Sequence, residues 1–476
     1  MERMKDKLQQ KKQGKHIIYV TYIFTGLFVL VIGYYTYFML AQSRDVINNT
    51  YNKRQEVLAE HVLRGEILSA DGKVLARTIV NEDGSEIREY PYHEMYAHVV
   101  GRLLKGSTGI EAIENIRLVT ADTNPLDNML NELMGNKNIG NNVVTTIRAD
   151  LQKVAYEALG DYRGAVVVME TSTGKILAMV SKPDYDPNEI ESSWTELIED
   201  EAEESPLLNR ATQGLYPPGS TFKILTTLAY IRENPLYDNY SYDCNGEISY
   251  KNMTIHCYNN RAHGEENLKT SFAKSCNSSY ANIGSHLNLD DFNTLCEKFL
   301  FNRQLPFELP SNPSDFSLHT ANSSVKEAMQ TAIGQGLTLM TPLHNAMIAA
   351  TVANKGIMMK PYVVNQIVNA DGNIIKKYPS KEYATLMTNE EAKILSEMMR
   401  EVVTDGTGSK LKDMDVEIAG KTGSAEQTNK PAHSWFVGYA PFDQPEIAVS
   451  IIVENKGTGS QYAVPIAKEI FEAYFK

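Results

Sequence analysis

The sequence predicts an α+β fold in which an antiparallel five-stranded sheet is flanked by helices, together with a smaller N-terminal domain and one N-terminal transmembrane helix. Three observations support this prediction. No charged residue occurs from Ile17 to Leu40. Two apolar runs joined by a short turn lie between Gly164 and Val180. After a long region of helical pattern, three more strand-like runs cover residues 416–425, 434–439 and 447–453.

The uncharged stretch is long enough to cross a bilayer, because a helix of about 24 residues spans roughly 36 Å. Six basic residues precede it: Arg3, Lys5, Lys7, Lys11, Lys12 and Lys15. This charge bias predicts a cytoplasmic tail (1–16), a membrane helix (17–40) and an extracytoplasmic remainder. A cleaved signal peptide is the alternative, but the stretch exceeds the apolar core of about 7 to 15 residues expected there.

Residues 41–143 are interpreted as a non-catalytic N-terminal or stalk domain. The first part, from 42 to about 70, has the mixed charge and apolar spacing of a helix or stalk. Asp71-Gly72 lies between two alternating apolar runs, which predicts a hairpin. From Pro91 to Asn142 the apolar pattern comes in short pieces with little continuous core.

Residues 144–476 are interpreted as the second, larger domain. The hairpin between Gly164 and Val180 has richly apolar strands, so we expect it in a buried sheet. The acidic segment Glu189–Glu204 is expected to be a surface loop or helix. The expected helices run from 145 to about 159, from about 220, and over 267–287, 343–352, 389–403 and 463–475.

Composition narrows the classes of function. The net charge of −13 argues against nucleic acid or an anionic membrane surface as the main partner. The four cysteines are too few for a disulfide framework. The sequence contains no pattern for cradling phosphate or holding a cofactor, so no cofactor is predicted.

Ser220 is the predicted nucleophile. Pro217, Pro218 and Gly219 precede it, and the apolar run after it predicts a helix that starts near Ser220. Lys223 would lie one turn away, where a neutral amine takes the proton of the serine hydroxyl. The same spacing occurs at Ser172/Lys175, Ser271/Lys274, Ser323/Lys326 and Ser409/Lys412, so other elements must single out Ser220.

Two such elements follow, Ser275-Cys276-Asn277 and Lys421-Thr422-Gly423-Ser424, and each pattern occurs once in the chain. Ser275 is expected to relay the proton, and the Asn277 carboxamide to hold a substrate backbone amide. The second element is expected to be an edge strand on which Gly423 lets substrate approach.

Charge and backbone donors complete the predicted site. The hydroxyls of Thr422 and Ser424 are expected to bind a substrate carboxylate, drawn by the positive charge of Lys421. Burial and this second cation should lower the pKa of Lys223. The backbone amides of Ser220 and Ser424 are the expected oxyanion donors.

Cys244 and Cys257 leave three alternatives open: free thiols, a disulfide formed outside the membrane, or a zinc site with His256 and His263. The spacing fits no familiar zinc motif, and no metal is predicted. Cys276 is assigned to packing rather than chemistry.

The ordered set of three motifs resembles that of class B penicillin-binding proteins, which are monofunctional peptidoglycan D,D-transpeptidases of the penicillin-binding protein and serine β-lactamase superfamily. The resemblance extends over nearly the whole chain, and further segments contribute to it: Tyr185-Asp186-Pro187-Asn188, Gly334-Gln335-Gly336 and His433-Ser434-Trp435-Phe436-Val437-Gly438. It implies the penicillin-binding transpeptidase fold, acylation of Ser220 by the penultimate D-alanine of a stem pentapeptide, loss of the terminal D-alanine, and transfer to a neighbouring amine.

The resemblance also implies partners: peptidoglycan stem peptides on lipid-linked precursor strands, β-lactams as substrate mimics, and a membrane glycosyltransferase of the shape or division type. Three alternatives stay open. A D,D-carboxypeptidase uses the same residues with water as acceptor. A β-lactamase would need a water-positioning glutamate, and the nearest segment, Glu297 to Asn302, has the wrong spacing. A non-catalytic scaffold or β-lactam sensor would not need the intact motifs.

Overall fold

The computed structural model describes residues 2–38, 60–199, 204–427 and 429–476. The chain divides into two compact units, Met1–Glu60 and His61–Lys476. In the first unit, helix α1 (Glu2–Tyr37) includes the stretch Ile18–Tyr37, which is long and apolar enough to cross a membrane. Most of the helix or stalk expected from residue 42 lies outside the described residues, and from Val62 onward that expectation is wrong because the chain forms short strands β1 (Val62–Leu63) and β2 (Ile67–Leu68).

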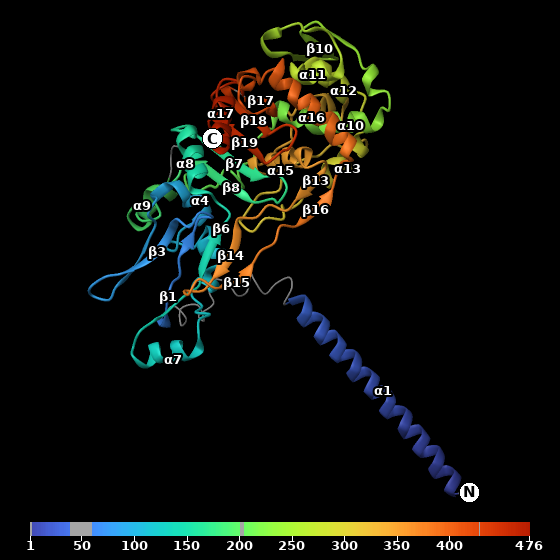
Figure 1. The fold of residues 1–476 in the computed structure, drawn as a ribbon. Helices are drawn as coiled ribbons and strands as arrows, with labels where there is room; N and C mark the ends of the chain where they lie inside the picture. The colour runs from blue at the N-terminus through green and yellow to red at the C-terminus, as the bar shows by residue number, and fades with distance from the viewer. Residues whose placement is uncertain (1, 39–59, 200–203, 428) are drawn as a thin grey trace. The chain divides into compact units, whose positions relative to one another are not determined.

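A five-stranded antiparallel sheet of order β17-β18-β19-β7-β8 lies in the described part of the second unit, with helices around it (Figure 1). The early hairpin and the three late strands meet where β19 pairs with β7. This confirms the predicted fold class, although β17 begins later than the expected Val416. The strands are β7 (Gly164–Glu170), β8 (Ile176–Lys182), β17 (Ala419–Gln427), β18 (Lys430–Ala440) and β19 (Ile447–Val453).

Helices cover both faces of this sheet. Successive side chains of a strand point to opposite faces, and here both sets are apolar, so both faces need to be buried. On one face, α8 (Ala149–Leu159) and α17 (Ala463–Phe475) bury residues such as Val166 and Val449. On the other face, α15 (Pro342–Ala353) packs against β7, β18 and β19 and is buried along its whole length.

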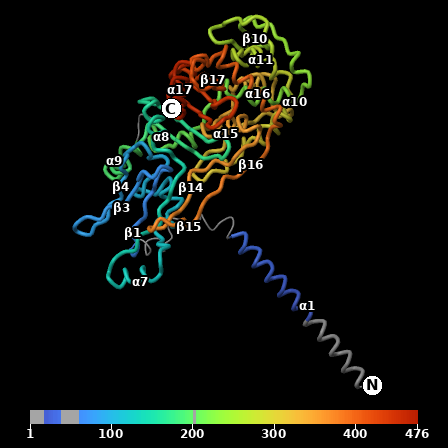
Figure 2. Tube along the Cα trace, viewed as in Figure 1, coloured from blue at the N-terminus to red at the C-terminus, as the bar shows by residue number. Residues whose placement is uncertain are grey.

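Within the second unit, the labelled helices α10, α11 and α16 lie close together, as the tube in Figure 2 shows. Helix α10 packs against α12, α13 and α16, and α16 also packs on β17. Their bounds are α10 (Lys223–Glu233), α11 (Leu268–Ala273), α12 (Asn277–Gly284), α13 (Leu289–Lys298), α14 (Val325–Ala332) and α16 (Asn389–Thr404). The acidic segment forms α9 (Ile190–Ile198), as far as it is described.

A second sheet joins distant parts of the chain. Among the described residues it has six strands in the order β15-β14-β6-β2-β3-β4. The hairpin predicted around Asp71-Gly72 is present as β2 and β3. Unexpectedly, β14 and β15, from far along the chain, extend the same sheet through β6. Besides β2, its strands are β3 (Val74–Val80), β4 (Glu86–Glu89), β6 (Asn142–Thr145), β14 (Val364–Val368) and β15 (Ile374–Lys377).

A buried ion triad ties the N-terminal elements together. Glu111, on α5 (Gly109–Ile113), is fully buried and pairs with Arg64 at 2.6 Å and with Arg88 at 2.7 Å. Burial acts to raise the pKa of Glu111, but the two guanidinium groups hold it below its usual value. The carboxylate is therefore charged and fully paired.

Glu111→Ala should lower the free energy of unfolding by about 3 to 5 kcal/mol, because it leaves two arginines buried without their partner. Urea denaturation of the purified protein measures this loss. The control is Glu157→Ala, which removes the exposed pair with Lys153 and should cost less than about 0.5 kcal/mol. Equal losses in the two variants would contradict the prediction.

Candidate active site

Ser220 lies on a tight turn between two proline residues and a helix. The turn is the 3-10 helix η3 (Gly219–Phe222), and the α-helix α10 begins only at Lys223. The α-helix expected from about Ser220 therefore starts three residues later, and Ser220 itself lies in the tighter turn before it. This turn packs against strand β17.

Two glycines allow the backbone around Ser220 to pack closely. Gly219 has a φ of +54°, and a Cβ atom there would lie 2.8 Å from the carbonyl oxygen of Ser424. Gly334 has a φ of +78°, and its Cβ would lie 1.8 Å from the carbonyl oxygen of Gly219. The Gly219 amide donates to the Gly334 carbonyl oxygen at 2.8 Å. These contacts place Ser220 beside Ser424.

Lys223 is fully buried. Its Nζ donates to the Ser275 carbonyl oxygen at 2.9 Å, to the Ser275 hydroxyl at 3.3 Å and to the Asn277 Oδ1 at 2.9 Å. Burial lowers the pKa of Lys223 to about 8, against an opposing effect of the thiols of Cys276 and Cys257. About a tenth of this amine is therefore neutral at pH 7, far more than for a lysine with its usual pKa of about 10.4.

The single helix expected over 267–287 is wrong, because the chain breaks between α11 and α12. Ser275 adopts a φ of +58°, the left-handed region that costs energy for a residue with a Cβ. The Ser275 amide still donates to the Phe272 carbonyl oxygen, and Cys276 becomes the N-cap of α12. The break brings Ser275 and Asn277 to the Lys223 amine.

Lys421 lies on β17, the outermost strand of the five-stranded sheet in the described residues, and its side chain is buried. Its Nζ donates to the Ser275 hydroxyl at 2.9 Å and to the Thr422 carbonyl oxygen at 3.1 Å. Burial and the neighbouring Lys223 hold the pKa of Lys421 well below its usual value. The Ser275 hydroxyl thus lies between two lysine amines.

The other residues of the third motif continue along β17. A Cβ atom at Gly423 would lie 3.1 Å from both the Pro218 carbonyl oxygen and the Thr221 Cγ2. The Gly459 amide donates to the Ser424 hydroxyl at 3.4 Å. The edge-strand expectation is met, and the strand runs directly beside the Ser220 turn.

The structure therefore brings Lys223, Ser275, Asn277 and Lys421 into one hydrogen-bonded network. Ser220 is adjacent to it, although within the described part of the chain no hydrogen bond joins its hydroxyl to Lys223. A neutral lysine, a bridging serine hydroxyl and a second lysine form a path along which a proton can move.

Some neighbours of the network had no assigned role in the sequence. The hydroxyls of Thr407 and Thr422 lie 2.5 Å apart, which ties the loop after α16 to β17. The rings of Tyr280 and Phe272 lie 5.0 and 5.4 Å from the Nζ atoms of Lys223 and Lys421. In the sequence, the two glycines around Thr407 could have indicated a functional loop. Phe272 and Tyr280 instead have the sequence pattern of ordinary core residues of helices.

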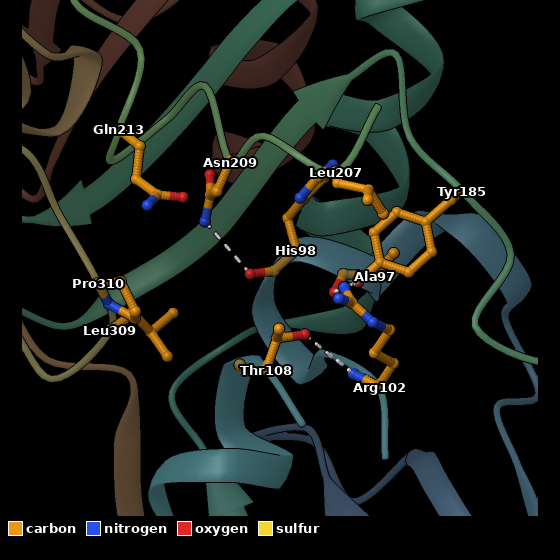
Figure 3. Close-up of a pocket in the computed structure, with 11 residues that line it drawn as sticks. Ala97, His98, Arg102, Thr108, Tyr185, Leu207, Asn209, Gln213, Leu309 and Pro310 are labelled. Atoms are coloured by element: carbon orange, nitrogen blue, oxygen red, sulfur yellow. Dashed lines mark hydrogen bonds between the residues drawn. The ribbon is translucent and has the colours of Figure 1, made fainter. Parts of the chain in front are cut away.

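A separate pocket occurs where the N-terminal elements meet the catalytic half (Figure 3). The Tyr185 ring lies beside Arg102 on one side of it, and Gln213, Leu309 and Pro310 lie on the other. The Asn209 side chain donates to the His98 carbonyl oxygen at 3.2 Å, as the dashed line shows. None of the residues predicted for the site lines this pocket, which we regard as part of the joint between the domains.

The chain is similar to known proteins over most of its length. Residues 164–472 match the family model of the penicillin binding protein transpeptidase domain, and residues 64–143 that of the penicillin binding protein A dimerisation domain. The peptidoglycan D,D-transpeptidase PbpA of Mycolicibacterium smegmatis is 33% identical over 470 residues, covering 88% of this chain and 91% of that protein.

Solved structures are similar over the same length. The imipenem acyl-enzyme complex of penicillin-binding protein A from M. tuberculosis matches with a TM-score of 0.81 at 31% identity, covering 88% of this chain and 100% of that one. The D,D-transpeptidase domain of a peptidoglycan glycosyltransferase from Eggerthella lenta matches with a TM-score of 0.79 at 29% identity, covering 87% and 98%.

Gly334→Ala should destabilise the protein more than Gly72→Ala does. Both glycines have a φ of +78°, but a Cβ at Gly72 meets nothing within 4 Å. Gly72→Ala should cost about 1 to 2 kcal/mol for the left-handed backbone, and Gly334→Ala a further 1 to 3 kcal/mol or so for the clash with Gly219. Thermal unfolding of both variants measures the difference, and equal midpoints would refute the close approach at Gly219.

Proposed function

The chain belongs to the penicillin-binding protein transpeptidase family, and from this we propose how its residues carry out the family's reaction. It is a peptidoglycan D,D-transpeptidase and a β-lactam target. The observation that carries the assignment of roles is the Ser275 hydroxyl, which lies between the buried amines of Lys223 and Lys421 beside the Ser220 turn.

Ser220 is the proposed nucleophile. Its Oγ attacks the carbonyl carbon of the penultimate D-alanine, and neutral Lys223 takes the hydroxyl proton. The backbone amides of Ser220 and Ser424 stabilise the oxyanion of the tetrahedral intermediate. When the intermediate collapses, an ester to Ser220 remains and the peptide bond to the terminal D-alanine breaks.

Ser275 carries a proton to the amine of the departing D-alanine, and Lys223 supplies it through their hydrogen bond. An amine of a neighbouring stem peptide then attacks the ester, loses its proton along the same path, and regenerates the Ser220 hydroxyl. We take the two lysines to share one positive charge, because two ammonium groups on one hydroxyl repel each other in a buried site.

Asn277 and the β17 residues bind the substrate in this proposal. The Asn277 amide holds a substrate backbone amide, and Gly423 lets the peptide lie against the strand. The hydroxyls of Thr422 and Ser424 bind the terminal carboxylate, attracted by the charge near Lys421. These roles account for a substrate with a free C-terminal carboxylate.

We also propose the arrangement of the chain in the cell. Residues 1–16 form a cytoplasmic tail, residues 17–40 cross the membrane, and the rest is extracytoplasmic, since basic residues precede the helix. Residues 41–143 form the N-terminal domain and residues 144–476 the transpeptidase domain. The lipid-linked strands that it cross-links come from a membrane glycosyltransferase of the shape or division type.

Ser220→Ala should abolish covalent labelling by a fluorescent penicillin while the fold stays intact, because the attacking oxygen is gone. Mass spectrometry of the labelled peptide and circular dichroism check the two parts. The matched control is Ser172→Ala, which removes the serine of another pair with a lysine three residues later and should leave labelling unchanged. A penicillin adduct on any other serine would contradict the assignment.

The fate of the acyl-enzyme separates the possible activities. Release of D-alanine with formation of a cross-linked dimer in the presence of an acceptor amine is expected for a transpeptidase. Release of D-alanine with water as the sole acceptor would identify a D,D-carboxypeptidase. Rapid loss of the penicillin adduct would identify a β-lactamase.

The acylation rate should rise with pH and level off above about pH 8. The active form of Lys223 is neutral, and burial lowers its pKa to about 8, so protonation removes the base as the pH falls. Below that pKa the second-order rate constant for penicillin acylation should fall about tenfold per pH unit. Stopped-flow labelling between pH 5.5 and 9.5 measures it, and a flat profile would exclude Lys223 as the base.

A further inference from the structure

Four side chains with metal-binding atoms gather close to the second motif. The Sγ atoms of Cys244, Cys257 and Cys276 and a ring nitrogen of His263 all lie within 4.8 Å of one another. Four segments of the chain supply them: Cys244 ends β9 (Tyr242–Cys244), Cys257 follows β11 (Met253–His256), His263 directly precedes β12 (Gly264–Glu266), and Cys276 is the N-cap of α12. The cluster therefore forms only when this part of the chain is folded.

The three cysteine side chains pack on one another, apart from the main apolar core. Cys244, Cys257 and Cys276 form a buried cluster of their own, and the partly buried ring packed against it is that of Tyr242. The surrounding strands pair only in short ribbons, β9 with β12 (Gly264–Glu266) and β10 (Glu247–Tyr250) with β11. Such small ribbons bury too little apolar surface to be stable alone.

The spacing of the cluster matches that of a tetrahedral zinc site. With Zn–S bonds of about 2.3 Å, tetrahedral geometry places two sulfurs about 3.8 Å apart, and a sulfur and an imidazole nitrogen about 3.5 Å apart. The Cys244–Cys257 and Cys257–Cys276 sulfur distances are 3.7 and 3.8 Å, and the Cys244 sulfur lies 3.4 Å from His263 Nδ1. All four cysteines of the chain are free in the described structure.

We propose that Cys244, Cys257, Cys276 and His263 bind one zinc ion. Three thiol protons leave for solvent on binding, so the site of three thiolates, a neutral imidazole and Zn²⁺ carries one negative charge. The set differs from the one considered on sequence alone, because His256 instead pairs with Glu247 at 3.1 Å and Cys276 takes its place. The expectation of no metal is replaced by this proposal.

Hydrogen-bonding groups next to the three sulfurs favour thiolates. The Ser278 hydroxyl lies 3.0 Å from the Cys244 sulfur, 3.3 Å from that of Cys257 and 3.4 Å from that of Cys276. The Ser279 amide donates to the Cys276 sulfur at 3.4 Å. The Ser278 hydroxyl and the Ser279 amide can each donate one hydrogen bond to a sulfur, which stabilises its negative charge and orients it toward the ion.

The zinc site would affect the reaction by holding Ser275 and Asn277 in place. Cys276 stands between Ser275 and Asn277, so an ion held by Cys276 anchors the break between α11 and α12 and maintains the left-handed backbone of Ser275. Cys276 is therefore a positioning residue for Ser275 and Asn277. This part of the inference rests on the proposed function, whereas zinc binding itself does not.

The test begins with metal content. The full chain, purified in detergent without chelators, should contain one zinc per protein by elemental mass spectrometry. After removal of zinc under reducing conditions, Co²⁺ should produce the visible bands of a tetrahedral site and a cobalt–thiolate charge-transfer band in the near ultraviolet.

Variants identify the ligands. Cys257→Ser and His263→Ala should lose the zinc, and His263→Cys should retain it because thiolate replaces imidazole as a fourth ligand. The matched control is Cys296→Ser, since Cys296 on α13 is equally buried but lies outside the cluster, and this variant should keep its zinc. Wild-type protein with no more zinc than Cys257→Ser and no cobalt bands, or with a Cys244–Cys257 disulfide, would overturn the proposal.

Penicillin labelling tests the positioning role separately. Zinc-free protein should be acylated about ten- to a hundredfold more slowly than the zinc-loaded form, and re-addition of zinc should restore the rate. Ser220→Ala should keep its zinc and lose labelling. An unchanged acylation rate after zinc removal would refute the positioning role, while failure of the Ser220 assignment would leave the metal content unaffected.

Discussion

The structure of the site depends on the burial of two lysine side chains around one serine hydroxyl. Lys223 comes from α10, Lys421 from β17, and Ser275 from the break between α11 and α12. Each amine has a lowered pKa because water is excluded from it. The sheet, the helix and the break have to assemble together before any of these groups acquires its chemistry.

Close packing around the Ser220 turn serves that assembly. Gly219 and Gly334 bring two backbones into contact, and the Trp435 indole donates to the Pro217 carbonyl oxygen at 3.1 Å. Tyr216 donates to Glu454, which also pairs with the buried Arg210 at 2.8 Å. The turn is therefore held from both sides by groups that take no part in proton transfer.

Local sequence signals predicted the elements of the catalytic half well. Apolar runs located all five strands of the central sheet, and the order of three short motifs named the residues that meet at Ser275. The left-handed backbone of Ser275 could not be predicted, since nothing in the residue type requires it. Two other features could not be predicted either: the pairing of β14 with β6, and the proximity of Cys276 to Cys244. Both are contacts between distant segments, which leave no local pattern in a single sequence.

The shared six-stranded sheet has a consequence for how this protein can be divided. Strands β14 and β15 belong by sequence to the C-terminal half, but β14 pairs with β6, which in turn pairs with β2. Truncation ahead of residue 144 would remove β2, β3, β4 and half of β6, and leave β14 with a row of unsatisfied backbone groups along one side. Such an exposed edge promotes aggregation, so the transpeptidase half is expected to be soluble only when the N-terminal strands accompany it.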